Sequence, residues 1–329
     1  MKAYRLTAGG GIDGLTRVDL PDPTPGPGEV VIRVRATSLN YRDLGIARRS
    51  AVGVIPLSDG AGEVVALGEG ARLAIGDRVA GCFMPYWRDG DVSPEYQRDA
   101  LGGTVDGVLA EQIVLPAASV VRLPDYLTYE EAATLPCAAV TAWNAMFEAT
   151  RLRPGSTVLL LGTGGVSIFG LQLGVAAGMR TIVTSSSDAK LEKARALGAD
   201  ETINYRERED WERAVLDLTG GRGVDLVLEV GGVGTFTKSN AATRVGGNIV
   251  IIGALAADEG GGMAPLVGRN VHATRISVGS RRMFEDMNRA LEAREVHPVI
   301  DRVFDFDQAL EAYRYLQSQA HMGKVVVRV

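Results

Sequence analysis

The chain has 329 residues, of which 46% are hydrophobic and 23% are charged, so it can form two globular domains, each with its own core. The composition excludes disordered, collagen-like and membrane-embedded proteins. The formal net charge of -5 gives no attraction to phosphate backbones or anionic lipid surfaces, so we expect neither nucleic acid nor a membrane as a partner.

About the first 120 residues predict a mainly β region. Short apolar runs alternate there with Gly, Pro and Asp clusters, and helix signals are nearly absent. The runs are residues 29–39, 61–70, 76–83 and 110–116. A helix-like stretch with an internal Pro136 follows at residues 129–150.

From residue 156 onward, strands and helices alternate. The expected strands are residues 156–162, 180–185, 201–205, 224–230 and 247–253, and the expected helices between them are residues 165–178, 188–198, 211–220 and 233–245. Parallel strands need crossover connections, which are usually helices. The sequence therefore predicts an α/β fold with a doubly wound parallel sheet of the Rossmann type.

Two further helices, at residues 282–293 and 307–319, precede a last strand at residues 323–329. We expect this tail to return to the N-terminal domain. The predicted organisation is a substrate domain of residues 1–125 and 276–329, with a dinucleotide-binding domain of residues 126–275 inserted between them.

The first predicted parallel strand runs into a glycine-rich turn that a helix follows at once. Gly162 can make the tight turn and Gly164 can let the backbone approach a pyrophosphate, while Gly165 and Val166 begin the helix, whose N-terminus favours anions. The third glycine of the usual fingerprint is replaced by Ser167. The pattern predicts a bound dinucleotide, and the alternative is a ligand-free strand-to-helix turn.

Hydroxyl groups stand where NAD-binding proteins of this fold have a carboxylate that holds the ribose. The second strand ends in residues 184–187, which are all Thr or Ser and include Ser185. Lys190 follows in the next helix, and Tyr205 follows the third strand. These residues predict NADPH rather than NADH; a solvated Lys190 and a Tyr205 that only packs at the sheet edge are the alternatives.

In its motifs and their order, the chain resembles the medium-chain dehydrogenase/reductase superfamily. Within it, the chain is similar to the branch without zinc, which includes quinone oxidoreductases and enoyl reductases. The motifs span nearly the whole chain and are SLNYRD (38–43), SDGAGEVVALGEG (58–70), GDRV (76–79), DGVLAEQIVLP (106–116), LPCAAVTAW (135–143), LGTGGVS (161–167), LGAD (197–200) and GKVVVRV (323–329). The resemblance implies that the β region is a GroES-like domain.

Zinc alcohol dehydrogenases of this superfamily hold the metal with a Cys, a His and a second Cys. The positions that look equivalent here are Asn40, Ser58 and Cys137. Catalytic zinc needs about three protein ligands, so we expect no metal. Cys82 is the only cysteine near the stretch that carries four cysteines in the family's structural zinc lobe, and both cysteines are expected to be small buried side chains.

The resemblance also implies two groups of site residues. Asn40, Tyr41, Arg42 and Asp43 occupy the segment that faces the nicotinamide; for Asp43 a structural cap or ion pair is the alternative, and for Asn40 a local turn. The remaining residues lie where the cofactor passes: Thr141, Val230, Gly231, Ile252, Gly253, Gly279, Ser280 and Lys324. Residues 44–58 contain no Tyr, so the proton donor stays open between Tyr41, a water and the solvent.

The expected reaction is hydride transfer from NADPH to a quinone or an α,β-unsaturated carbonyl, in a cleft between the two domains. Two alternatives are an alcohol dehydrogenase or aldehyde reductase of the same superfamily and a non-catalytic NADPH-binding sensor. No signal-peptide pattern is found and only two cysteines are present, which favours the cytoplasm. The resemblance also implies a homodimer.

Overall fold

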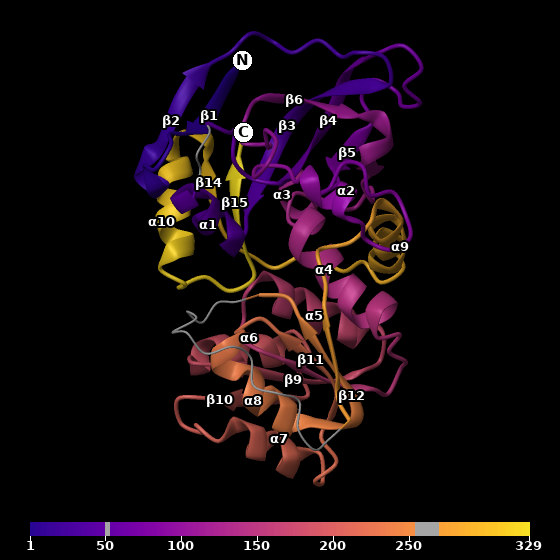
Figure 1. Ribbon diagram of the computed structural model, residues 1–329, viewed down its shortest axis with the longest axis vertical. Helices are drawn as coiled ribbons and strands as arrows, with labels where there is room; N and C mark the ends of the chain where they lie inside the picture. The colour runs from indigo at the N-terminus through magenta and orange to yellow at the C-terminus, as the bar shows by residue number, and fades with distance from the viewer. Residues whose placement is uncertain (50–52, 254–269) are drawn as a thin grey trace. The chain divides into compact units, whose positions relative to one another are not determined.

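The computed structural model describes residues 1–49, 53–253 and 270–329 (Figure 1). It divides into two compact units, Met1–Val140 with Val278–Val329, and Thr141–Ser277. The first boundary thus lies after Val140, whereas the sequence predicted it after Asp125. Helix α3 (Tyr129–Ala132) accounts for the difference, because it packs against strands β3, β4 and β15 of the first unit.

The first unit is built on a seven-stranded sheet. Its order is β14-β15-β3-β4-β5-β7, with β6 also paired to β3, and all pairs except β14–β15 are antiparallel. Strands β1 and β2 form a separate, antiparallel two-stranded sheet. The strands are β1 (Lys2–Leu6), β2 (Leu15–Asp19), β3 (Glu29–Leu39), β4 (Asp59–Leu67), β5 (Arg78–Gly81), β6 (Gln112–Pro116), β7 (Val120–Arg122), β14 (Ile300–Asp305) and β15 (Lys324–Arg328).

The C-terminal strand β15 returns to the N-terminal unit, as the sequence predicted. It pairs with β3 in antiparallel register, with Val325 opposite Leu39 and Val327 opposite Thr37. This register brings Lys324, the first residue of β15, to the end of β3 at Leu39 and Asn40. Two residues that are far apart in the sequence thereby become neighbours.

Helices occur in the first unit where the sequence predicted almost none. Helix α1 (Tyr41–Arg49) directly follows β3, and a short helix α2 (Pro94–Arg98) begins at the capping residue Ser93. The expectation of a nearly helix-free N-terminal region was therefore wrong. The other helical segments of this unit are η1 (Gly11–Gly14), η2 (Ala117–Ser119), η3 (Leu135–Ala139), α9 (Arg281–Glu292), η5 (Phe306–Gln308) and α10 (Ala309–Gln317).

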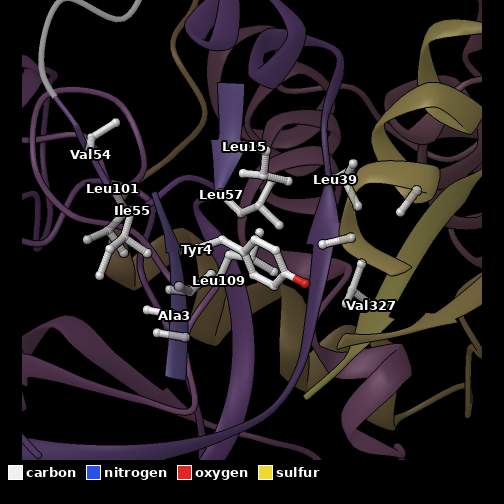
Figure 2. Close-up of a cluster of buried hydrophobic side chains, with 14 of the residues drawn as sticks. Ala3, Tyr4, Leu15, Leu39, Val54, Ile55, Leu57, Leu101, Leu109 and Val327 are labelled. Carbon is white, nitrogen blue, oxygen red and sulfur yellow. The ribbon is translucent and has the colours of Figure 1, made fainter. Parts of the chain in front are cut away.

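The core of the first unit joins the sheet to α1 and α10. Figure 2 shows Tyr4, Leu39, Leu57 and Leu109 converging with Val327 of the returning strand. All five side chains are buried. Burial of apolar surface is the main stabilising term here, and it fixes the position of Asn40, the residue after Leu39.

The second unit is a six-stranded parallel sheet with helices between its strands. The order β10-β9-β8-β11-β12-β13 is the 3-2-1-4-5-6 order of dinucleotide-binding folds, which confirms the predicted fold class. The strands are β8 (Thr157–Leu160), β9 (Arg180–Ser185), β10 (Glu201–Asn204), β11 (Val224–Glu229), β12 (Thr243–Ile251) and β13 (His272–Arg275). The helices are α5 (Gly165–Ala176), α6 (Asp188–Ala196), α7 (Trp211–Leu218) and α8 (Val233–Ala242).

The stretch predicted as helical at residues 129–150 is helical but irregular. After α3 it continues as the π-helical η3, then α4 (Val140–Trp143), then the π-helical η4 (Asn144–Ala149). Pro136 lies in the first turn of η3, where a missing N–H breaks no helical hydrogen bond. Among the described residues, no helix is long and apolar enough to cross a membrane.

Candidate active site

The glycine-rich turn of the second unit has the geometry of a phosphate cradle. Gly162 has a φ of +72°, which favours glycine, and Gly164 stands at the N-terminus of α5 without a side-chain cap. A Cβ atom added to either glycine would meet no atom within 4 Å. Ser167 turns its hydroxyl back to the carbonyl of Leu161 at 2.6 Å. The turn therefore leaves room, and helix N–H groups, for a pyrophosphate.

Two of the predicted ribose-phosphate residues, Ser185 and Tyr205, lie together at the ends of β9 and β10. Ser185 is buried, its hydroxyl accepts a hydrogen bond from the N–H of Ser187 at 3.3 Å, and its carbonyl accepts one from the N–H of Tyr205 at 3.0 Å. The Tyr205 ring is exposed. Thr184 accepts from the N–H of Gly162 at 3.2 Å and so ties this strand end to the cradle. Lys190 lies in the first turn of α6.

A buried carboxylate that the sequence reading missed organises the next turn. Glu229 ends β11 and is fully buried. One of its oxygens accepts hydrogen bonds from the N–H of Gly231 at 2.8 Å, the N–H of Gly232 at 2.9 Å and the hydroxyl of Thr235 at 2.6 Å, and the other accepts from Ser239. The available signal was a Glu near the end of the mainly apolar run 224–230, whose other charged residue is Asp225.

The carbonyl of Glu229 also holds the end of the neighbouring strand. It accepts from the N–H of Ile252 at 2.9 Å and from the N–H of Gly253 at 3.4 Å. The predicted residues Val230, Gly231, Ile252 and Gly253 thus form one backbone cluster around Glu229. Thr141, the first residue of the second unit, is buried in α4.

In the first unit, Asn40 and Lys324 meet directly. The Lys324 ammonium donates to Asn40 Oδ1 at 2.6 Å and to the carbonyl of Leu39 at 2.8 Å, and lies 3.5 Å from Asp59 Oδ2. Both charged side chains are buried, with 2% and 0% of their surface exposed. Asn40 Nδ2 is buried and has no hydrogen-bond partner among the described residues. Asn40 therefore has a donor without a partner among the described residues, while its oxygen accepts from Lys324.

The three positions that look equivalent to zinc ligands are linked through Asp59. Ser58 donates its hydroxyl to Asp59 Oδ1 at 2.6 Å, and the N–H of Cys137 donates to Asp59 Oδ2 at 3.3 Å. Burial raises the pKa of the Cys137 thiol well above its ordinary value, and the Asp59 carboxylate raises it further. Across residues 1–49, 53–253 and 270–329, no group of three or more His, Cys, Asp or Glu side chains could hold a metal ion.

Asp43 caps the helix that the sequence reading missed. Its carboxylate accepts the N–H of Asn40 at 2.7 Å, and the N–H of Asp43 donates to the carbonyl of Asn40 at 2.9 Å. Burial raises the pKa of Asp43 to about 6; Asp59 adds to this rise, whereas Arg42, the Asn40 N–H and Lys324 oppose it. The geometry is that of the capping alternative.

The side chains near Asp43 differ in their contacts and in their exposure. The Arg42 guanidinium donates to the carbonyl of Leu101 at 3.0 Å and lies 4.4 Å from the centre of the Phe83 ring. Tyr41 is 37% exposed. The Tyr313 hydroxyl is buried with no hydrogen-bond partner in the described part of the chain, and burial, with Asp43 nearby, raises its pKa well above its ordinary value.

Gly279 and Ser280 shape the start of α9. A Cβ atom at Gly279 would stand 2.6 Å from Val140 Cγ1, so this position requires the close approach that glycine allows. The Ser280 hydroxyl accepts the N–H of Met283 at 3.2 Å and caps the helix. Both residues therefore have a structural reason to be present.

Two family descriptions match the chain. Residues 26–125 match the alcohol dehydrogenase GroES-like domain, and residues 165–293 match the zinc-binding dehydrogenase family. The first match lies in the seven-stranded unit. The second covers most of the parallel sheet.

Individual relatives match over nearly their whole length. A zinc-type alcohol dehydrogenase-like protein from Schizosaccharomyces pombe is 45% identical, over 92% of this chain and 91% of the relative. A quinone oxidoreductase from Pseudomonas aeruginosa is 29% identical over 99% of both chains. The crystal structure of an NAD-dependent alcohol dehydrogenase superimposes with a TM-score of 0.91 and 34% identity, and covers all of both chains.

Proposed function

We propose that this chain, which belongs to the medium-chain dehydrogenase/reductase superfamily, transfers hydride from NADPH to a quinone or an α,β-unsaturated carbonyl without a catalytic zinc. As a member of that superfamily it is an oxidoreductase with a nucleotide cofactor. The observation that carries the proposal is the Asn40 side chain, whose Nδ2 is a buried donor without a partner among the described residues, while its oxygen is held by Lys324.

The donor set around Asn40 supports a reaction without zinc. Zinc binds deprotonated Cys, neutral His or carboxylate groups, and a catalytic site needs about three of them. Ser58 is not such a ligand, and Asn40 Oδ1 already accepts from an ammonium group. The Lys324 ammonium group, whose charge is paired with Asp59, already lies beside the Asn40 oxygen that would have to bind the zinc ion.

The proposed class of acceptor follows from how far a neutral hydrogen-bond donor can stabilise the negative charge that develops on the acceptor oxygen. NADPH, when bound by the cradle at Gly162 and Gly164, supplies the hydride. Asn40 Nδ2 then donates a hydrogen bond to the acceptor oxygen as negative charge develops there. A conjugated acceptor spreads this charge over an enolate, so it needs less help than an isolated carbonyl, which usually relies on a Lewis acid.

The preference for NADPH is supported by the end of β9. The strand ends at Ser185 and not at a carboxylate, and Lys190 follows in the first turn of α6. A carboxylate at the strand end would repel a 2'-phosphate, whereas hydroxyl groups can donate to it. A similar solved structure is described as an NAD-dependent alcohol dehydrogenase. The preference of this chain for NADPH over NADH must therefore be measured.

The test of the proposed function is the rate of NADPH consumption with a panel of quinones, enones, enals and simple aldehydes. We expect turnover with at least one quinone or enone. Asn40→Ala should lower kcat about 10²- to 10³-fold with little change in NADPH affinity, since losing one oxyanion donor has a cost of that order. Asn40→Asp is the matched variant, because it can still accept from Lys324 but has no Nδ2 donor.

Efficient ethanol or benzyl alcohol oxidation without reduction of any conjugated acceptor would contradict the proposal. That result would favour the second candidate, an alcohol dehydrogenase, which the description of the Schizosaccharomyces pombe relative favours. Tight NADPH binding without turnover on any acceptor or alcohol would instead indicate a sensor.

A separate test addresses the cofactor. The double variant Ser185→Asp with Lys190→Ala should reverse the preference from NADPH to NADH, because it adds a repulsive charge and removes a cation. The expected change in relative kcat/KM is roughly tenfold to a hundredfold. Equal use of both cofactors by the unmodified protein would contradict the assignment.

A further inference from the structure

We propose that Lys324 is a positioning residue that fixes which way the Asn40 carboxamide faces, and thereby makes Asn40 a hydrogen-bond donor and not an acceptor. The inference rests on the proposed function, in which Asn40 Nδ2 contacts the acceptor oxygen. It gives Lys324 a different role from the cofactor contact that the family resemblance implies.

The Lys324 ammonium group is held by two hydrogen bonds and an ion pair. It donates to the Leu39 carbonyl at 2.8 Å and to Asn40 Oδ1 at 2.6 Å, and it lies 3.5 Å from Asp59 Oδ2. A lysine ammonium has three donors and no acceptor. Since the side chain is 2% exposed, water cannot readily replace these acceptors. The ammonium group is therefore held by groups of the first unit itself.

The chemistry of the contact determines the orientation of the amide. An ammonium group can only donate, so the atom of Asn40 that faces it must be the oxygen. Rotating the carboxamide by half a turn would place two donors against each other in a buried site. Nδ2 must therefore point away from Lys324, and it has no acceptor in the described part of the chain. A buried donor without a partner is costly unless a ligand supplies one.

Asp59 keeps the ammonium group in place. Its two oxygens accept from the Ser58 hydroxyl and from the N–H of Cys137, which anchors the carboxylate on two sides. The pair of opposite charges allows Lys324 to stay charged while buried. Asp59 therefore acts on Asn40 through Lys324.

This orientation has a consequence for the substrate. A carbonyl or enolate oxygen can accept from Asn40 Nδ2, and it carries no proton that needs an acceptor. The Nδ2 group points away from Lys324 and is therefore the part of Asn40 that such an oxygen can contact. The orientation of the carboxamide thus favours a substrate whose reacting oxygen accepts a hydrogen bond.

The test uses a charge-neutral double variant, Lys324→Met with Asp59→Asn. Lys324→Met alone would leave the Asp59 carboxylate buried and unpaired, which can prevent folding. In the double variant we expect kcat for the best enone or quinone to fall at least about tenfold with little change in KM for NADPH. Adding Asn40→Ala to the double variant should lower kcat by much less than it does in the unmodified protein, because both changes remove the same function.

A second measurement does not depend on turnover. In protein labelled with ¹⁵N at asparagine, the side-chain NH₂ signals of Asn40 are identified by their absence in Asn40→Ala. We expect one sharp pair of signals in the unmodified protein, and broadened or doubled signals in the Lys324→Met/Asp59→Asn variant, because the carboxamide is then free to rotate.

The outcomes separate the two proposals. Unchanged Asn40 signals in the double variant, or an Asn40→Ala effect on kcat of full size in both backgrounds, would overturn the positioning role of Lys324. If the unmodified protein reduces none of the acceptors, the proposed function fails, and the Asn40 signals alone decide whether Lys324 holds the carboxamide. Broadened signals would then still support the positioning role.

Discussion

Asp43 is a buried carboxyl group whose charge destabilises the folded chain. Burial raises its pKa from 3.8 to about 6. Between these two values the folded state binds more protons than the unfolded state, so the free energy of unfolding falls as pH rises through this window and is lowest above it. At about 1.4 kcal/mol per pKa unit, the cost at pH 8 is about 3 kcal/mol.

Asp43→Asn should therefore stabilise the protein at pH 8 by as much as about 3 kcal/mol, and by clearly less at pH 5. The amide oxygen can still accept the N–H of Asn40, so the cap is kept. Urea unfolding at both pH values measures the difference, with Asp91→Asn, an exposed position, as the control. A loss of stability at pH 8 would show that the Asp43 charge is needed for the fold.

Glu229 supports a turn and does so mainly by accepting hydrogen bonds. Glu229→Ala would leave the buried N–H of Gly232 and the N–H of Gly231 without their acceptor, at a cost of roughly 2–4 kcal/mol. Glu229→Gln keeps one oxygen at the same place and should cost about 1 kcal/mol or less. Chemical unfolding of both variants checks this, and equal losses would mean that size or charge, and not the acceptor, is what matters.

At the scale of elements, a substitution in the turn between β8 and α5 can weaken NADPH binding without changing the stability of the fold. Gly164 has a φ of -77°, which every residue type adopts, and a Cβ there would meet no protein atom within 4 Å. Gly164→Ala should change the free energy of unfolding by less than about 0.5 kcal/mol. It should nevertheless weaken NADPH binding at least about tenfold, because the methyl group would occupy the space of the pyrophosphate.

Calorimetric titration with NADPH and urea unfolding together test this prediction. Gly155→Ala is the control: Gly155 has a φ of +83° and open space around its Cβ position, so strain should lower stability while NADPH binding is kept. Unchanged affinity in Gly164→Ala would place the pyrophosphate elsewhere.

Elements with mainly apolar runs could be predicted from the sequence, and their alternation with helices predicted the doubly wound parallel sheet. Strands β8 and β11 are buried throughout, so most of their residues are apolar and the sequence predicts both as strands. Helix α1 was missed because it is short and amphipathic, and because Asn40 and Asp43 were interpreted only as site residues or a local cap. Helix α8 ends at Ala242 and not at residue 245, because β12 begins at Thr243.

The site residues also divide into those that a local sequence pattern predicts and those that depend on contacts between distant parts of the chain. The Gly162–Gly164 turn is local in sequence, so the turn itself could be predicted, and its contact with a pyrophosphate stays a prediction. Contacts of Lys324 with Asn40 depend on the register of β15 against β3, which no local pattern encodes. The role of Glu229 was likewise hidden, because one charged residue at the end of an apolar strand gives no indication of the four donors that fold back onto it.

On the scale of the whole molecule, each unit has its own apolar core, and the segment from Cys82 to Leu101 is held by protein contacts. Trp87 stacks on Tyr96 with ring centres 6.5 Å apart and donates from its indole to the Gly90 carbonyl at 3.0 Å. The N–H of Leu101 returns to the Phe83 carbonyl at 3.1 Å. Aromatic packing and backbone hydrogen bonds hold this segment, for which the family resemblance suggested comparison with a structural zinc lobe.

These contacts predict that the protein needs no zinc for folding or for activity. Structural zinc supplies folding energy, so its removal lowers the melting temperature, and catalytic zinc supplies the Lewis acid, so its removal abolishes turnover. Neither effect is expected here, because Ser58 is not a zinc ligand, Asn40 Oδ1 already accepts from Lys324, and protein contacts hold the segment from Cys82 to Leu101. Prolonged dialysis against a chelator should therefore change neither the melting temperature nor NADPH-dependent turnover, and elemental analysis should find far less than one zinc per chain. About one zinc per chain, with activity lost on its removal and restored by zinc, would contradict both this expectation and the proposed role of Asn40.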